Sequence, residues 1–330
     1  MATRRYAAEL RPGDRVDDTY VLRGKEMRAA RTGEAYLSLE LTDRSGRVAG
    51  IMFRPDRAAQ DVPVDTVVRV RGAVTSYRGT DRISVTSLRP SEHYEATEIM
   101  AVSSRDVREM VDELRTLTRS VEDPALAALL RSVFGDRAFF ARFKVSPAAH
   151  HACVGGLLEH TVAVAATCSH LADAYPLAAR DLLVCAALLH DVGVVEQIRG
   201  GVGVDLTDEG RLLGHVMLGE RRIRTVCERV DPQLSPETML CLTHAIAAHH
   251  QDGGGSSVPA PATLEAMLLR RADEIDITAT GFAESLRPAG LVQEPWTGTD
   301  NPFGRPLRAP REVAAGEGPK PRRVLHAMSA

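Results

Sequence analysis

The hydrophobic pattern changes its period partway along this chain of 330 residues, and this change restricts the fold more than any other feature. Up to about residue 90, apolar residues alternate with polar ones; from about Ser103 they recur at three- and four-residue spacing. Alternation is typical of half-buried strands, and the longer spacing is typical of amphipathic helices. The sequence therefore predicts a multidomain protein, with an all-β domain followed by all-α structure.

The first block, residues 1–92, reads as a small β-barrel. The stretch "AYLSLELTDRSGRVAGIMF" puts Leu37, Leu39 and Leu41 on one face, and "DRSG" turns the chain into a second strand. The stretch "TVVRVRGAVTSYRGTDRISVTSL" repeats this pattern. With the preceding "YVLRGKEMRAA" there are five short strands, which is enough for a closed barrel.

The rest of the chain divides into three parts. Residues 93–146 contain three helical segments, each starting near a Ser or Asp that can cap a helix, and we interpret them as a connector. Residues 147–286 form a larger all-helical block. Residues 287–330 are rich in Pro, Gly and Arg, which predicts an extended or disordered tail.

Charge and apolar content restrict the class of protein. The net charge is −3, yet residues 1–90 carry 17 Lys and Arg against 12 Asp and Glu, which is compatible with a nucleic-acid partner for the barrel. No apolar stretch reaches the ~20 residues that a membrane span requires, and the basic N-terminus lacks the apolar region of a signal peptide. We therefore expect a cytoplasmic protein with no membrane partner.

In the helical block, residues of the metal-ligand type stand where the pattern predicts apolar ones. They are His160, His190, Asp191, His215, His249, His250 and Asp273. A buried carboxylate or imidazole costs several kcal/mol unless a partner satisfies it, and a divalent metal ion would satisfy both types. The alternative for any one of them is a core histidine bonded to a helix carbonyl, but seven such residues in one domain favour metal binding.

Seven candidate ligands are too many for a single ion that must also hold substrate. We therefore expect two divalent ions, with the Asp191 carboxylate bridging them and a water activated between them. On this hypothesis His190 and Asp191 are the central catalytic residues. The spacing alone leaves open which ligand binds which ion.

Several phrases of the helical block resemble a known family. "HHACVGGLLEHT", "ALLHDVG", "TDEGRLLGH", "HAIAAHH" and "RRADEID" are similar, in order and spacing, to the HD-domain phosphohydrolases, specifically the YhaM-type 3'-5' exoribonucleases. The resemblance implies an OB-fold barrel that binds single-stranded nucleic acid, followed by an HD-domain bundle with a manganese-supported centre; iron, cobalt and magnesium are alternatives. It assigns His160, His190, Asp191 and Asp273 to one ion, and His215, His249 and His250 to a second that shares Asp191.

This chain departs from the family pattern at two positions. Val194 stands where the family usually has a lysine that contacts the substrate phosphate, and Gln251 stands where the family usually has glycine. Losing the lysine removes on the order of 2–4 kcal/mol of transition-state stabilisation, which predicts a slow enzyme. Lys144, Arg199 and Arg211 are the candidate replacements for that lysine. The candidate substrate contacts are Lys144, His151 and Arg211.

The barrel carries side chains suited to a single strand of nucleic acid. Aromatic rings stack on bases, and arginines line the groove. The candidates are Tyr36, Phe53, Arg54, Arg69, Arg71 and Arg78. Because aromatic residues make up only 4% of the chain, we expect the barrel to bind by charge more than by base; the alternative for Tyr36 and Phe53 is packing within the barrel.

Three functions remain open from the sequence. The leading hypothesis is a metal-dependent 3'-5' exoribonuclease that acts on single-stranded RNA, or on DNA, through a metal-activated water. The second is an HD-type phosphohydrolase of free or cyclic nucleotides. The third, supported by Val194, is a nucleic-acid-binding protein with impaired turnover. The sequence also leaves open a homo-oligomer.

Overall fold

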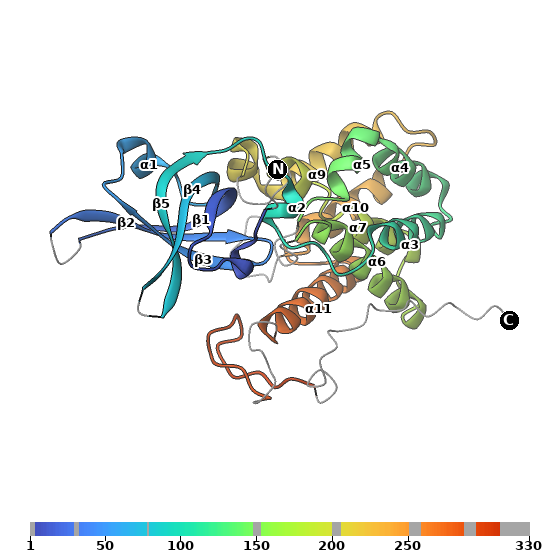
Figure 1. Ribbon diagram of the computed structural model, residues 1–330. Coiled ribbons are helices and arrows are strands. Elements are labelled where there is room, and N and C mark those ends of the chain that lie inside the picture. The colour runs from blue at the N-terminus through green and yellow to red at the C-terminus, as the bar shows by residue number, and fades with distance from the viewer. Residues whose placement is uncertain are drawn as a thin grey trace. The chain divides into compact units, whose positions relative to one another are not determined.

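Figure 1 shows the computed structural model, in which strands occupy the N-terminal part of the chain and helices the remainder. The structure describes residues 4–29, 33–77, 79–147, 153–199, 206–250, 259–286 and 295–310. Contacts divide the chain into two compact units that alternate along the sequence. The first comprises residues 1–103, 136–158 and 191–222, and the second comprises residues 104–135, 159–190 and 223–330.

The first unit contains a closed five-stranded barrel. Its strands are β1 (Arg15–Ala29), β2 (Ala35–Asp43), β3 (Gly46–Phe53), β4 (Thr66–Tyr77) and β5 (Thr80–Pro90), in the order β1-β2-β3-β5-β4. All pairings are antiparallel except β3 with β5. Strand β1 closes the barrel because its first half pairs with β4 and its second half with β2. The predicted OB-fold barrel is confirmed.

Alternation fills the barrel interior as the sequence predicts. Leu37, Leu39 and Leu41 are buried, and Ser38 and Glu40 between them are partly exposed. Apolar residues of all five strands form one core inside the barrel. Burial of these side chains, at roughly 25 cal/mol for each Å² removed from water, is the main stabilisation of the barrel.

Strand β1 begins five residues earlier than the predicted strand, which starts at Tyr20. Apart from the buried Val16, the segment from Arg15 to Asp18 is polar, so a single apolar residue gives too little alternation to predict a strand, and pairing with β4 imposes the extended conformation. The β4–β5 ladder shifts register at Gly72, where a Cβ atom would lie 2.3 Å from the carbonyl oxygen of Ser84. Glycine allows this close approach of two strands.

Short helices complete the first unit. They are the 3-10 helix η1 (Ala7–Glu9) and the α-helices α1 (Arg57–Asp61), α2 (Ala96–Ile99), α5 (Arg137–Phe143), α8 (Val194–Gln197) and most of α9 (Asp208–Cys227). Asp56 and Asp136 cap α1 and α5 by accepting hydrogen bonds from backbone N–H groups of the first turn. Helix α9 is broken at Gly214, whose φ of 71° lies in the left-handed region.

The second unit is all-helical. It contains α3 (Val107–Arg119), α4 (Pro124–Gly135), most of α6 (Gly156–Ala174), α7 (Arg180–Leu189), α10 (Pro236–Ala248) and α11 (Leu264–Leu286). Helix α7 lies at its centre, because it contacts α3, α4, α10 and α11 and is buried from Leu183 to Leu189. An uninterrupted apolar run therefore predicts the central helix of this unit. The run ends at Leu189, and His190 is the C-cap of the helix.

Part of the predicted tail is folded. Residues 295–310 form a turn in which Trp296 pairs with Arg308, Leu307 and Ala309 are buried, and Phe303 packs edge-on against Phe282 of α11. The rest of the tail, residues 287–294 and 311–330, lies outside the described residues. Among the helices of the described chain, none combines the length and apolar character needed to cross a bilayer.

Candidate metal centre

Three side chains meet at the centre of the helical unit. His160 lies on α6, His190 follows the last residue of α7, and Asp273 lies on α11. All three are nearly completely buried. The Nε2 atoms of the two imidazoles are 3.1 Å apart, and Asp273 Oδ1 lies 3.2 Å from Nε2 of His160 and 4.0 Å from Nε2 of His190. The predicted ligands therefore converge although 113 residues separate the first from the last.

The other ring nitrogen of each imidazole is already engaged. His160 Nδ1 lies 2.8 Å from Oδ2 of Asp276, and His190 Nδ1 lies 2.8 Å from the carbonyl oxygen of Ala187. A carboxylate and a carbonyl only accept hydrogen bonds, so Nδ1 carries the proton in both rings. In the neutral rings, Nε2 is left with a lone pair directed at the shared centre.

This donor set fits a divalent metal ion. Two lone pairs and a carboxylate oxygen within 4.0 Å repel one another unless a positive charge lies among them. Neighbouring ligands of an ion with bonds of about 2.1 Å are separated by about 3.0 Å in octahedral geometry. The distances of 3.1 and 3.2 Å are close to that separation.

Two further histidines extend the cluster at the end of α10. His249 is buried, its Nδ1 donates to the carbonyl oxygen of Ile246 at 2.6 Å, and its ring lies edge-on to His190 with centroids 5.1 Å apart. His250 is partly exposed, and its Nδ1 lies 3.5 Å from Oδ2 of Asp273. The helical unit thus brings five of the seven predicted ligands together.

The Asp273 carboxyl is an anion at neutral pH in this environment. Burial raises its pKa, but the surrounding imidazoles of His160, His190 and His249 lower it by more. The pKa therefore lies below the ordinary value of 3.8. A carboxylate held in the charged form is ready to bind a cation.

The remaining two predicted ligands pair with each other in the first unit. His215 Nε2 lies 3.3 Å from Oδ1 of Asp191. Asp191 follows His190 directly in the chain. The peptide bond between residues 190 and 191 thus joins the two groups of ligands.

Two glycines shape the surroundings of this pair. A Cβ atom on Gly193 would lie 2.0 Å from the carbonyl oxygen of His215, so only glycine allows α8 to pass α9 this closely. The break of α9 at Gly214 comes immediately before His215 and so sets where that residue resumes the helix. The two glycines near the ligands are therefore explained by backbone geometry, without any part in binding metal.

The chain matches two domain families. Residues 157–278 match the model of the HD domain, and residues 20–91 match that of the OB-fold nucleic acid binding domain. The protein is an OB-fold protein with an HD domain. In sequence it is 27% identical to 3'-5' exoribonuclease YhaM of Bacillus velezensis, over 89% of this chain and 96% of the relative. It is 29% identical to YhaM of Bacillus subtilis, over 80% and 85%, and 27% identical to YhaM of Listeria innocua, over 88% and 94%. The resemblance to this family is confirmed.

The candidate substrate contacts of the HD domain are only partly described. Lys144 follows the last residue of α5 and is half-buried, and Arg211 is exposed on α9, four residues before His215. His151 and Gln251 lie outside the described residues. Val194 is 7% exposed at the start of α8, so its side chain packs inside the unit.

The candidate aromatic residues of the OB-fold lie together on its surface. Tyr36 and Phe53 are paired across β2 and β3, their ring centroids are 5.5 Å apart, and Phe53 is 44% exposed. Two neighbouring rings with exposed area can accept a stacked base. This arrangement favours base contact over packing alone.

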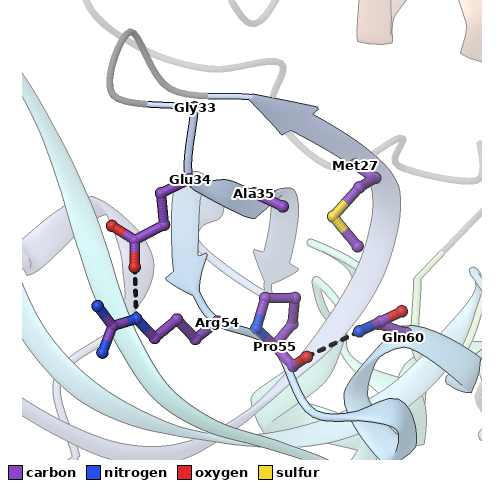
Figure 2. A pocket seen from close by; sticks show the side chains of 7 residues that line it. All are labelled: Met27, Gly33, Glu34, Ala35, Arg54, Pro55 and Gln60. Atoms are coloured by element: carbon purple, nitrogen blue, oxygen red, sulfur yellow. Dashed lines mark hydrogen bonds and ion pairs between the residues drawn. The ribbon is translucent and has the colours of Figure 1, made fainter.

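The candidate arginines of the OB-fold have acidic neighbours. Arg54 Nε lies 2.5 Å from Oε1 of Glu34 at the edge of an open pocket of about 630 Å³, which Figure 2 shows. Arg69 and Arg71 both contact Oδ1 of Asp17, at 2.6 and 3.2 Å. Arg78 lies outside the described residues. Carboxylates therefore offset part of the positive charge predicted for the barrel.

One polar residue of the HD domain was missed from the sequence. Asp276, one turn after Asp273 on α11, contacts His160; the spacing of the two carboxylates in "RRADEID" could have indicated a shared helix face. His244 accepts a hydrogen bond from the backbone N–H of Ala262 at 2.8 Å, and so supports the segment before α11. No spacing in the sequence indicates that second contact.

Proposed function

We propose that the protein is a metal-dependent 3'-5' exoribonuclease that hydrolyses single-stranded RNA from its 3' end in the cytoplasm. One observation carries the proposal: buried imidazoles and a buried carboxylate converge in an HD domain that follows an OB-fold. Relatives that are similar over most of their length bear the name 3'-5' exoribonuclease. RNA is preferred over DNA on the strength of that name.

The proposed ligands form two sets that share Asp191. The first set is His160, His190, Asp191 and Asp273, and the second is Asp191, His215, His249 and His250. Two divalent ions held there would act as Lewis acids toward a water and toward the phosphate oxygens. Manganese is the first choice, ahead of iron, cobalt and magnesium, because the resemblance to the YhaM-type exoribonucleases implies it; imidazole and carboxylate donors suit several of these ions.

The chain's own residues prepare this chemistry in three ways. The Nδ1 hydrogen bonds of His160, His190 and His249 fix each ring so that Nε2 faces the centre. Burial of the cluster excludes bulk water and strengthens its electrostatic interactions. Asp191, a carboxylate next to His190 in the chain, is proposed to belong to both ligand sets and so to help to hold the ions that would activate the attacking water.

Because the Val194 side chain carries no charge, other side chains must supply the positive charge that contacts the scissile phosphate. Lys144, Arg199 and Arg211 are the proposed replacements, and His151 is a further proposed substrate contact. In the barrel, Tyr36 and Phe53 stack on bases while Arg54, Arg69, Arg71 and Arg78 contact the backbone. Such a surface binds strands of many sequences and releases them as salt rises.

The decisive experiment follows 5'-labelled single-stranded RNA with added manganese. The proposal predicts products that shorten stepwise from the 3' end, and it predicts that Asp191→Ala abolishes shortening. Asp112→Ala is the matched control, because Asp112 is an exposed carboxylate on α3 in the helical unit. Absence of shortening by the wild-type protein, or full activity of Asp191→Ala, contradicts the proposal.

A second candidate function is supported by the burial of Val194. A chain without the phosphate-binding lysine can bind nucleic acid and metal yet turn over slowly. Metal analysis and a nuclease assay of the wild type and a Val194→Lys variant test this function. A wild-type protein that binds metal but is inactive, together with an active variant, would support it. A panel of free and cyclic nucleotides tests the nucleotide phosphohydrolase alternative in the same assay, and light scattering determines whether the protein is a homo-oligomer.

A further inference from the structure

Asp276 is a buried carboxylate that is not among the proposed metal ligands. It lies on α11 with 5% exposure, one turn after Asp273. Its Oδ2 atom lies 2.8 Å from Nδ1 of His160, which is itself 3% exposed. A buried carboxylate costs several kcal/mol unless hydrogen bonds and positive charge compensate it. Its burial next to His160 therefore points to a function in the cluster.

The partner of His160 differs in kind from those of the other buried imidazoles. His190 and His249 donate from Nδ1 to backbone carbonyls of the preceding turn, those of Ala187 and Ile246. Those carbonyls are neutral and are fixed by the helix itself. His160 donates to a charged side chain from a different helix. A charged acceptor makes a stronger hydrogen bond and raises the basicity of the opposite nitrogen.

We infer that Asp276 is a positioning residue that acts through His160 on metal affinity, an inference that rests on the proposed metal centre. The carboxylate holds the proton of His160 on Nδ1 and turns the Nε2 lone pair toward Asp273 and His190. It also makes Nε2 a stronger donor than the same atom of His190. Helix α11 thus supplies both a ligand and the group that orients a second ligand.

The test compares Asp276→Asn with Glu274→Gln. Both changes remove one negative charge from α11, but Glu274 faces Arg270 and Arg271 on the surface and not His160. Asparagine keeps an oxygen that accepts the Nδ1 proton, so the variant loses the charge and keeps the shape. Manganese affinity is measured by titration calorimetry on the full chain.

The inference predicts that Asp276→Asn binds manganese about 10- to 100-fold more weakly, and that Glu274→Gln binds as the wild type does. Unchanged affinity of Asp276→Asn overturns it. If the wild-type protein itself binds no manganese, the proposed metal centre fails, and the inference fails with it. If the wild type binds manganese but releases no nucleotides from RNA, the exoribonuclease proposal fails while the affinity comparison still decides the role of Asp276.

A spectroscopic measurement separates this role from a merely structural one. The ¹⁵N shifts of the His160 ring report which nitrogen carries the proton. In the metal-free wild type they should show the proton on Nδ1, and in Asp276→Asn they should move toward a mixture of both tautomers. A wild-type ring that is protonated on Nε2 contradicts the inference, even if the variant fails to fold.

Discussion

At the scale of single residues, Gly193 determines how closely the backbone packs around the Asp191–His215 pair, because its side chain is a single hydrogen atom. Gly193 lies two residues after Asp191, and its α-carbon faces the backbone of α9 at His215 and Gly219. Any Cβ atom there would overlap with the carbonyl oxygen of His215, which cannot move without moving the proposed ligand. Backbone contact at this point links the geometry of the pair to the packing of two helices.

Replacing Gly193 by alanine should therefore be costly. The added methyl group would lie 2.0 Å from an oxygen and 2.4 Å from a nitrogen, so α8 and α9 must separate. We expect Gly193→Ala to lose about 1–3 kcal/mol of unfolding free energy, together with manganese affinity. Chemical denaturation and calorimetry measure the two effects. Gly135→Ala is the control, since a Cβ there meets no atom within 4 Å and should cost nothing.

The residues of the site could be predicted to the extent that their polarity interrupts an apolar helical pattern. His160, His190 and Asp273 stand out for that reason, and the structure places them together. Asp276 does not stand out, because a carboxylate next to the exposed residues of "RRADEID" reads as part of a solvated face. Its partner lies 116 residues away, and only the packing of α6 on α11 reveals the contact.

At the scale of elements, α5 is held at its start by its N-cap residue, Asp136, and by an arginine of α9, Arg222. Asp136 accepts hydrogen bonds from the backbone N–H groups of Ala138 and Phe139, at 3.0 and 3.1 Å. Arg222 of α9 contacts Asp136 and Glu196 of α8, at 2.8 and 3.1 Å, and its guanidinium lies over the ring of Phe139. One side chain thus ties three helices together next to the Asp191 segment.

The stability contribution of Asp136 should depend on pH. The backbone N–H of Phe139, and Arg222 after it, hold the pKa of Asp136 below its ordinary value of 3.8. Because the pKa of Asp136 is lower in the folded than in the unfolded protein, its charge stabilises the fold. This stabilisation is complete above the pKa of the unfolded state and is lost as the pH falls through the pKa of the folded state. We expect Asp136→Ala to lose about 1 kcal/mol near neutral pH, with the difference from wild type shrinking below about pH 4. Denaturation curves across this range check it, and a difference independent of pH contradicts it.

A second element-scale prediction concerns β1 and β4. Asp17 contacts both Arg69 and Arg71, which partly cancels the charge proposed to bind RNA. Asp17→Asn should therefore tighten RNA binding and steepen its dependence on salt by roughly one counterion. Fluorescence anisotropy at several salt concentrations measures both. Asp65→Asn is the matched control, because Asp65 pairs with Arg23, which has no proposed contact with RNA. Identical salt slopes for the three proteins would refute the proposed role of Arg69 and Arg71.

The bounds of a helix or strand could be predicted where its own side-chain pattern determines them. They could not be predicted where contacts with other parts of the chain determine them. The alternation of Leu37, Leu39 and Leu41 predicts β2, and the apolar run from Leu183 to Leu189 predicts α7. The polar first residues of β1 are extended because β4 pairs with them. The break in α9 depends on Gly214, and a lone glycine within a helical pattern is usually tolerated without a break.

At the scale of the whole molecule, folding and metal binding should be linked. A ligand that binds only the folded state stabilises it by RT ln(1 + [L]/Kd), about 2.7 kcal/mol when the ligand is at 100 times its Kd. Manganese should therefore raise the melting temperature of the wild-type protein, and a chelator should reverse the increase. Asp273→Asn, which removes a buried proposed ligand, should abolish the response. A response of equal size in that variant contradicts the proposed centre.

The last prediction separates the work of the OB-fold from that of the HD domain. Phe53 is an exposed ring paired with Tyr36, far in sequence from every proposed ligand, so its loss should weaken binding of RNA and leave the chemistry of the metal centre unchanged. Base stacking is worth about 1–3 kcal/mol, which predicts that Phe53→Ala raises KM for RNA about 5- to 150-fold while kcat changes little.

Hydrolysis of a small phosphodiester such as bis(p-nitrophenyl) phosphate should be the same in wild type and variant, because that substrate has no base to stack. Tyr175→Ala, which removes an exposed ring from the helical unit, serves as the control. Equal loss on both substrates would mean that Phe53 supports the fold, and no loss on either would mean that RNA reaches the HD domain without contacting this ring.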